Sequence, residues 1–203
     1  MDNFCLNIKK FLSNRKNKLV KDAKLLDSKN SYKLSHKEYK LAAVLFPLIK
    51  KENEYEVILT TRSKDVLSHP GQVCFPGGRL DSQDMNMIDC ATREAYEEVG
   101  IKPDQVDILG ILDDCITGTD YKVTPVLGII NGCFVPKIQE REVADLFKVP
   151  LSFFLKKNNR KIITSTYKNK KYSYYEFNWK EKKIWGSTAR IIVNFCDIIN
   201  NIK

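Results

Sequence analysis

Arg93-Glu94-Ala95-Tyr96-Glu97-Glu98-Val99-Gly100-Ile101 is the most informative stretch of this chain. On an α-helix, Glu94, Glu97 and Glu98 stand at positions i, i+3 and i+4, so their carboxylates share one face. Like charges at these spacings repel one another, and a divalent cation with a preference for oxygen ligands would remove that repulsion. Taken alone, the three acids are better explained as an acidic, solvated helix end, because such strings are common, so the neighbouring sequence has to decide.

A glycine-rich turn lies upstream of the acids. Phe75-Pro76-Gly77-Gly78 predicts a tight loop whose backbone N–H groups can approach a phosphate or shape a cation site. A helix is predicted from Met85 or Met87 to Val99, and Gly100 predicts its end. Its apolar stripe consists of Ile88, Ala91, Ala95 and Val99. The acids therefore belong to a loop-helix-loop unit.

The loop and helix together resemble the signature of the Nudix hydrolase family. In this chain Gly78 is followed by five residues and then by Asp84, where the family usually has Glu. Eight residues separate Asp84 from Arg93, one more than in the general pattern. Gly77-Gly78-Arg79-Leu80-Asp81-Ser82-Gln83-Asp84 is instead similar to the coenzyme A diphosphatase branch of that family.

Other segments resemble the same branch. Ile58-Leu59-Thr60-Thr61-Arg62-Ser63, followed by His69-Pro70-Gly71-Gln72-Val73-Cys74-Phe75, is similar to the motif upstream of the signature in enzymes that hydrolyse coenzyme A. One departure is Leu67, which stands where that motif usually has Arg. The remaining similar segments are residues 123–128, 142–144, 149–151 and 184–191. The resemblance covers about residues 40–195.

The resemblance implies an α/β (α+β) Nudix fold, with a mixed β-sheet between α-helices and a loop-helix-loop metal site. It implies Mg²⁺ or Mn²⁺ held by Glu94, Glu98 and Glu97. Catalytic roles are implied for Glu97, Glu94 and Arg93. The general base is left open between Glu94, Glu97 and the loop residues Glu140 and Glu142. The substrate-binding residues implied by the resemblance are Arg62, Ser63, His69, Gly71, Phe75, Gly77, Gly78 and Arg79.

The implied reaction is hydrolysis of the diphosphate bond of coenzyme A or acyl-coenzyme A. Its products would be adenosine 3′,5′-bisphosphate and 4′-phosphopantetheine or its acyl derivative. One alternative is a Nudix hydrolase acting on a dinucleotide, a nucleotide sugar or capped RNA. Another is a non-enzymatic nucleic-acid-binding Nudix domain, which Glu94, Glu97 and Glu98 disfavour because a pure binder gains nothing from clustered carboxylates.

The distribution of charge bears on these alternatives. The net charge is +9, and residues 1–40 carry eleven Lys and Arg against four acids. A second basic cluster runs over residues 156–183. Basic surface favours polyanionic partners such as RNA, although lysine-rich, solvated faces are the simpler explanation. Nucleic acid therefore remains a secondary expectation beside a small-molecule substrate.

Length and composition predict one domain. The 203 residues are 43% hydrophobic, enough for a core, and no apolar run approaches the roughly 20 residues of a membrane-spanning helix. We expect a Nudix domain at residues 39–200, preceded by a basic, helical extension at residues 1–38 that turnover does not require. Scattered cysteines and the lack of a hydrophobic leader favour the cytoplasm, with mitochondrial or peroxisomal placement and a homodimer left open.

Periodicity gives the remaining elements. We expect one or two amphipathic helices within residues 3–26, a connector at 28–35 and no regular element at 68–82. Strands are predicted at 40–49, 55–61, 106–112 and 123–130, and a hairpin at 161–166 with 172–179. Short and terminal helices are predicted at 140–147 and 187–199.

Overall fold

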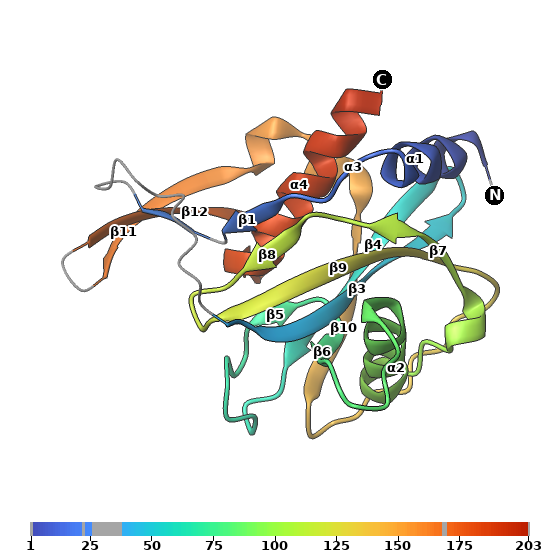
Figure 1. Ribbon diagram of the computed structural model, residues 1–203, viewed down its shortest axis with the longest axis horizontal. Helices are drawn as coiled ribbons and strands as arrows, with labels where there is room; N and C mark the ends of the chain where they lie inside the picture. The colour runs from blue at the N-terminus through green and yellow to red at the C-terminus, as the bar shows by residue number, and fades with distance from the viewer. Residues whose placement is uncertain (1, 22, 26–37, 168–169, 203) are drawn as a thin grey trace.

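The computed structural model of the protein describes residues 2–21, 23–25, 38–167 and 170–202 (Figure 1). In chain order the helices and strands are α1 (Asn3–Ser13), β1 (Leu19–Lys21), β2 (Ala23–Leu25), β3 (Lys40–Lys51), β4 (Glu54–Arg62), β5 (Val73–Cys74), β6 (Gly77–Arg79), α2 (Met87–Val99), β7 (Val106–Ile111), β8 (Asp114–Ile116), β9 (Tyr121–Ile130), β10 (Val143–Pro150), α3 (Leu151–Leu155), β11 (Lys161–Tyr167), β12 (Lys170–Trp179), β13 (Lys182–Trp185) and α4 (Gly186–Ile202).

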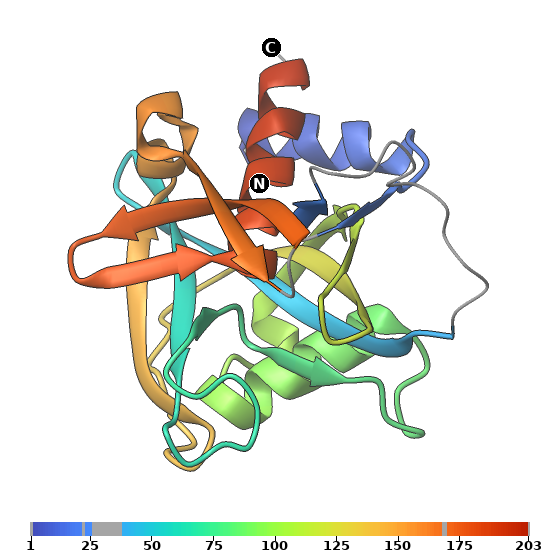
Figure 2. The ribbon, with the colours of Figure 1, turned by 90° about the vertical axis from the view of Figure 1, so that its left-hand side faces the viewer.

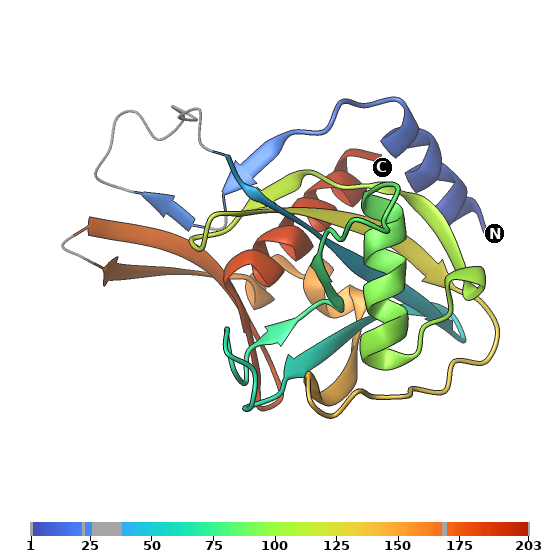
Figure 3. The same ribbon diagram turned by 60° about the horizontal axis from the view of Figure 1, so that its bottom comes forward.

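The strands form two sheets. The main sheet has the order β1-β8-β9-β3-β4-β10, and β5, β6 and β7 join it by pairing with β4, β3 and β9. The smaller sheet has the order β11-β12-β13, with β2 also paired to β12. Figure 3 shows the β11–β12 hairpin projecting from the body of the molecule.

Helices cover both faces of the main sheet. Along β3, Phe46 and Leu48 belong to the hydrophobic core shared with α1, α3 and α4, whereas Ala43 and Leu45 belong to the core beneath α2. This division follows from the alternation of side chains along a strand. The view in Figure 1 has α2 on one side of the sheet and α4 on the other. The expected mixed sheet between helices is confirmed.

Strands β3 and β4 diverge, and the turn that contains Gly77 and Gly78 lies between them. Residues 48–51 of β3 pair with residues 54–57 of β4. Further along, β3 pairs with β6 at residues 42–44, and β4 pairs with β5 at Thr60 and Thr61. The glycine turn therefore enters the sheet as two short strands, although we predicted no regular element at residues 68–82. This insertion places Gly77 and Gly78 over α2.

Helix α2 begins and ends as the sequence predicts. The side chain of Asn86 accepts hydrogen bonds from the backbone N–H groups of Ile88 and Asp89, which caps the first turn. Gly100 has φ 77°, and its N–H donates to the last turn of the helix. A left-handed residue at this position ends a helix, and glycine adopts it without steric cost.

One helix prediction is wrong. Residues 140–147 were expected to be helical, but Val143–Pro150 is a strand that pairs antiparallel with β4 along most of its length, so strand pairing overrides a weak local helical pattern. Of the one or two helices expected within residues 3–26, the described residues contain one, α1, and strands β1 and β2 follow it. The other predicted strands, the β11–β12 hairpin and the terminal helix are confirmed.

The N-terminal segment contributes to the core. Cys5, Ile8 and Leu12 of α1 are buried. β1 pairs with β8 of the main sheet, and β2 pairs with β12 of the smaller sheet, so this segment links the two sheets. The connector predicted at residues 28–35 lies outside the described residues. Within the described part of the chain, no helix is long and apolar enough to cross a membrane.

We predict that Ile8→Ala lowers the free energy of unfolding by about 2–4 kcal/mol, because Ile8 is 1% exposed and truncation leaves a cavity. Leu6→Ala is the matched control, since Leu6 lies on the same helix and is 50% exposed. Urea unfolding of both variants measures the difference. If both variants lose an equally small part of the free energy of unfolding, α1 does not stabilise the domain.

Candidate active site

Glu98 is a buried carboxylate beneath the glycine turn. It is 3% exposed, and its Oε2 accepts a hydrogen bond of 3.0 Å from the backbone N–H of Gly77. Burial raises the pKa of Glu98 to about 8, and the negative charge of Glu94 acts in the same direction. A charged carboxylate at this depth needs a positive partner to offset its desolvation.

Glu94 lies against the next residue of the turn. A Cβ atom on Gly78 would come within 2.5 Å of the Glu94 carboxylate, so only glycine fits there without displacing that side chain. The side chain of Glu94 is 16% exposed, and burial raises its pKa. Glu94 and Glu98 are one helical turn apart and therefore approach adjacent residues of β6.

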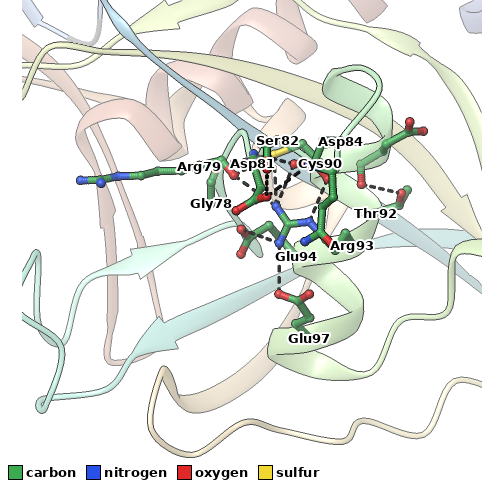
Figure 4. A network of polar contacts seen from close by, with 12 residues as sticks. Gly78, Arg79, Asp81, Ser82, Asp84, Cys90, Thr92, Arg93, Glu94 and Glu97 are labelled. Atoms are coloured by element: carbon green, nitrogen blue, oxygen red, sulfur yellow. Dashed lines mark hydrogen bonds and ion pairs between the residues drawn. The ribbon is translucent and has the colours of Figure 1, made fainter.

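Arg93 organises the acidic groups around this turn (Figure 4). Its Nε and Nη2 donate to the two oxygens of Asp84 at 2.8 and 2.9 Å. Its Nη1 donates to Glu94 at 3.0 Å and to Glu97 at 3.1 Å. The Arg93 guanidinium holds the pKa of the Asp84 carboxyl at about 2. This two-pronged ion pair ties the loop after β6 to helix α2.

Glu97 lies apart from the other two acids. Its side chain is 54% exposed, and its carboxylate turns toward Arg93. In the part of the chain that the structure describes, no three acidic, histidine or cysteine side chains form a group that could hold a metal ion. The predicted convergence of Glu94, Glu97 and Glu98 is therefore not found, and only Glu94 and Glu98 lie together under the turn.

Two residues outside the helix act on the buried pair. The negative charge of Glu142 raises the pKa of both Glu94 and Glu98, and the positive charge of Arg62 lowers the pKa of Glu98. The carbonyl of Glu142 accepts a hydrogen bond of 2.8 Å from the N–H of Ser63. The helix predicted at residues 140–147 would have placed Glu142 in its first turn, but these residues form no helix. Its place beside the site arises from the pairing of β10 with β4.

The loop after β4 carries three predicted substrate-binding residues. Ser63 is buried, and its Oγ accepts from the N–H of Asp65, so this hydroxyl shapes the turn. His69 and Gly71 are exposed, with φ of 58° and 70°. Leu67, at the position where the resemblance expected Arg, is fully exposed. No hydrogen bond of the described residues joins these side chains to the carboxylates.

Phe75 and Arg79 take two different positions. Phe75 is 2% exposed and packs on Phe46, with ring centroids 4.5 Å apart, so it lies in the core and does not line the site. Arg79 extends away from Glu94 and Glu97 in Figure 4. Its Nε donates to the hydroxyl of Tyr121 at 2.6 Å. Tyr121 carries no motif, and sequence reasoning missed it.

Comparison with known proteins identifies the family. The family model described as the NUDIX domain matches residues 38–159, more than half of the chain. An uncharacterized Nudix hydrolase NudL of Enterobacter sp. (strain 638) is 39% identical over 151 residues, covering 74% of this chain and 78% of the relative. The NudL of Shigella boydii serotype 4 is 35% identical over 163 residues, covering 80% and 83%.

Solved structures agree at the level of the fold. The MutT protein of Methanosarcina mazei Go1 matches with a TM-score of 0.50 at 18% identity, covering 83% of this chain and 95% of that one. Sequence and fold thus agree over the part of the chain that contains the glycine turn, the Arg93 network and the buried glutamates. The chain belongs to the Nudix family of hydrolases, whose members generally use divalent metal ions.

Proposed function

We propose that this hydrolase cleaves the diphosphate bond of coenzyme A and acyl-coenzyme A. The observation that carries the proposal is the pair of buried carboxylates, Glu94 and Glu98, beneath Gly77 and Gly78. The choice of substrate is supported by the similarity of residues 58–78 to the coenzyme A diphosphatase branch. Water adds across the bond, giving adenosine 3′,5′-bisphosphate and 4′-phosphopantetheine or its acyl derivative.

The residues present fit a divalent cation. Glu94 and Glu98 are buried oxygen donors that repel each other, and Glu98 forms no ion pair with any described residue. Glu97 can join them by leaving Arg93, since its side chain is largely exposed. Mg²⁺ or Mn²⁺ bound there would offset charge on the diphosphate oxygens and lower the pKa of the attacking water.

The chain's own residues divide the remaining tasks. Arg93 holds Glu94 in place through its contacts with Asp84 and Glu94. Glu142 is our candidate for the general base, because it is exposed, lies outside the Arg93 network and acts electrostatically on both buried acids. Arg62 adds a positive charge that lowers the pKa of Glu98 and would attract the diphosphate.

The first experiment measures hydrolysis of coenzyme A, dinucleotides, nucleotide sugars and capped RNA with Mg²⁺ or Mn²⁺. Coenzyme A is expected to have the highest kcat/KM. Glu98→Gln should lower that value about 100-fold or more, since it removes a cation ligand worth several kcal/mol. Glu181→Gln, in an exposed turn, is the control. Faster turnover of another substrate would overturn the assignment to coenzyme A and leave the family unchanged.

A second prediction concerns pH and stability without divalent cations. The pKa of Glu98 is about 8 in the folded protein and 4.5 ordinarily, so folding stabilises the protonated form. The protonated Glu98 therefore contributes its full stabilisation below pH 4.5. This contribution to the free energy of unfolding, on the order of a few kcal/mol, decreases above pH 4.5 and is lost as the pH rises through 8. Urea unfolding in a chelator should reveal the decline, and Glu98→Gln should largely abolish it.

Adding Mn²⁺ should reverse this dependence, because the cation binds the deprotonated carboxylates and releases a proton. Stability should then increase with pH toward 8. A decline that is the same with and without Mn²⁺ would argue against a cation at Glu98.

A third prediction tests the general base. Glu142→Gln should reduce kcat about 10²- to 10⁴-fold and leave KM nearly unchanged, because a general base acts in the chemical step. Glu140→Gln is the comparison, since Glu140 is also exposed in the same loop but is not among the main charges that act on Glu94 and Glu98. If Glu142→Gln retains the kcat of the unchanged protein, the base lies elsewhere.

A further inference from the structure

A basic group with an aromatic centre lies at the rim of the main sheet. Lys40 begins β3, Tyr121 begins β9 and pairs with Lys40, and Arg79 ends β6 opposite Ala42. The Arg79 guanidinium carbon lies 5.3 Å from the centroid of the Tyr121 ring, and the Lys40 ammonium lies 5.7 Å from it. Three strand ends thus bring two cations to one tyrosine.

Tyr121 fixes the orientation of Arg79, but no described acidic residue neutralises the charge of Arg79 or Lys40. The 2.6 Å bond from Arg79 Nε to the Tyr121 hydroxyl fixes the guanidinium. Neither Arg79 nor Lys40 forms an ion pair with any residue that the structure describes, and both side chains are exposed. Asp114, on the strand that pairs with the start of β9, is engaged by Lys122 at 3.5 Å and by the Thr124 hydroxyl at 2.7 Å. The outer nitrogens of Arg79 therefore face solvent with their charge available.

The group lies close to the buried carboxylates but across β6 from them. Gly78 faces Glu94, and since side chains alternate along a strand, Arg79 points to the opposite face. From Gly77 to Arg79 the strand advances only about 7 Å. On the edge of β6 away from β3, side chains of α2 hold the strand: the Gly77 N–H donates to Glu98, and the Arg79 carbonyl accepts from Arg93 Nη2 at 3.2 Å. Figure 2 shows the short strand β6 between β3 and α2. A ligand bound at the buried carboxylates has to pass only this one three-residue strand to reach the side chain of Arg79.

We propose that Arg79 and Lys40, oriented by Tyr121, form a subsite for a phosphate monoester that is not part of the cleaved diphosphate. The proposal rests on the proposed function, in which the ribose of coenzyme A carries such a group at its 3′ position. A planar guanidinium with two free nitrogens suits phosphate oxygens, and the ammonium adds a second charge. The subsite would select substrates with a 3′-phosphate over otherwise identical ones.

The test compares coenzyme A with 3′-dephospho-coenzyme A. Arg79→Gln and Lys40→Gln should each raise KM for coenzyme A about 10-fold or more, because each loses a charge-assisted contact, while kcat stays nearly constant. KM for the dephospho substrate should change less than about twofold. Arg79→Lys should restore part of the preference. If Arg79→Gln raises KM equally for both substrates, Arg79 only stabilises the structure of β6, and the proposed subsite is overturned.

Matched controls exist elsewhere in the chain. Arg160 lies 5.5 Å from the Tyr175 ring centroid, and Lys50 lies 5.9 Å from that of Tyr55. Arg160→Gln and Lys50→Gln remove similar cations from similar rings away from β6, and neither should alter the preference for the 3′-phosphate. A comparable effect in either control would indicate a general loss of positive charge and would overturn the assignment to Arg79 and Lys40.

Calorimetry separates the two proposals. Adenosine 3′,5′-bisphosphate should bind at least about 10-fold more tightly than adenosine 5′-phosphate, and Arg79→Gln should abolish the difference. If coenzyme A is not hydrolysed but this difference persists, the proposed substrate is wrong and the subsite stands. If coenzyme A is hydrolysed and the two nucleotides bind equally, the subsite is overturned and the proposed function stands.

Discussion

The burial of Glu98 is the constraint on which the site depends. A carboxylate that is 3% exposed and receives one backbone hydrogen bond, from Gly77, is charged only at a cost in free energy unless a positive partner offsets its desolvation. The sheet creates this situation because β3 and β4 diverge and admit the glycine turn directly over helix α2. The same divergence presses Gly78 against Glu94, so the backbone that covers one acid also fixes the other.

Arg93 forms ion pairs with Asp84, Glu94 and Glu97 but not with Glu98. By pairing with both oxygens of Asp84 it joins the loop to the helix, and it keeps Asp84 ionised. Its remaining nitrogen steadies Glu94 and retains Glu97 at the surface. Glu98 forms no ion pair with any described residue, and burial raises its pKa to about 8. Arg93 thus pairs with the other acids and leaves the buried Glu98 to be balanced by an external positive charge.

The second sheet and the N-terminal segment enlarge the domain around this centre. β1 and β2 belong to different sheets, so the segment before β3 holds the two sheets together, and α1 covers apolar side chains of the main core. We expected residues 1–38 to be a basic, helical extension that turnover does not require. The buried Cys5, Ile8 and Leu12 of α1 add to the core behind the sheet from which β6 and its Arg79 extend.

The local sequence determined those features of the structure that depend only on residues near one another in the chain. The glycine turn, the extent of α2, its end at Gly100 and the shared face of Glu94 and Glu98 all follow from spacing and from the freedom of glycine. Tertiary structure alone decided that Glu97 turns to Arg93, that Glu142 directly precedes a strand beside the site, and that Phe75 packs inside. It also brought Tyr121 to Arg79. These outcomes depend on which strands pair, and pairing joins residues whose separation along the chain leaves no periodic signal.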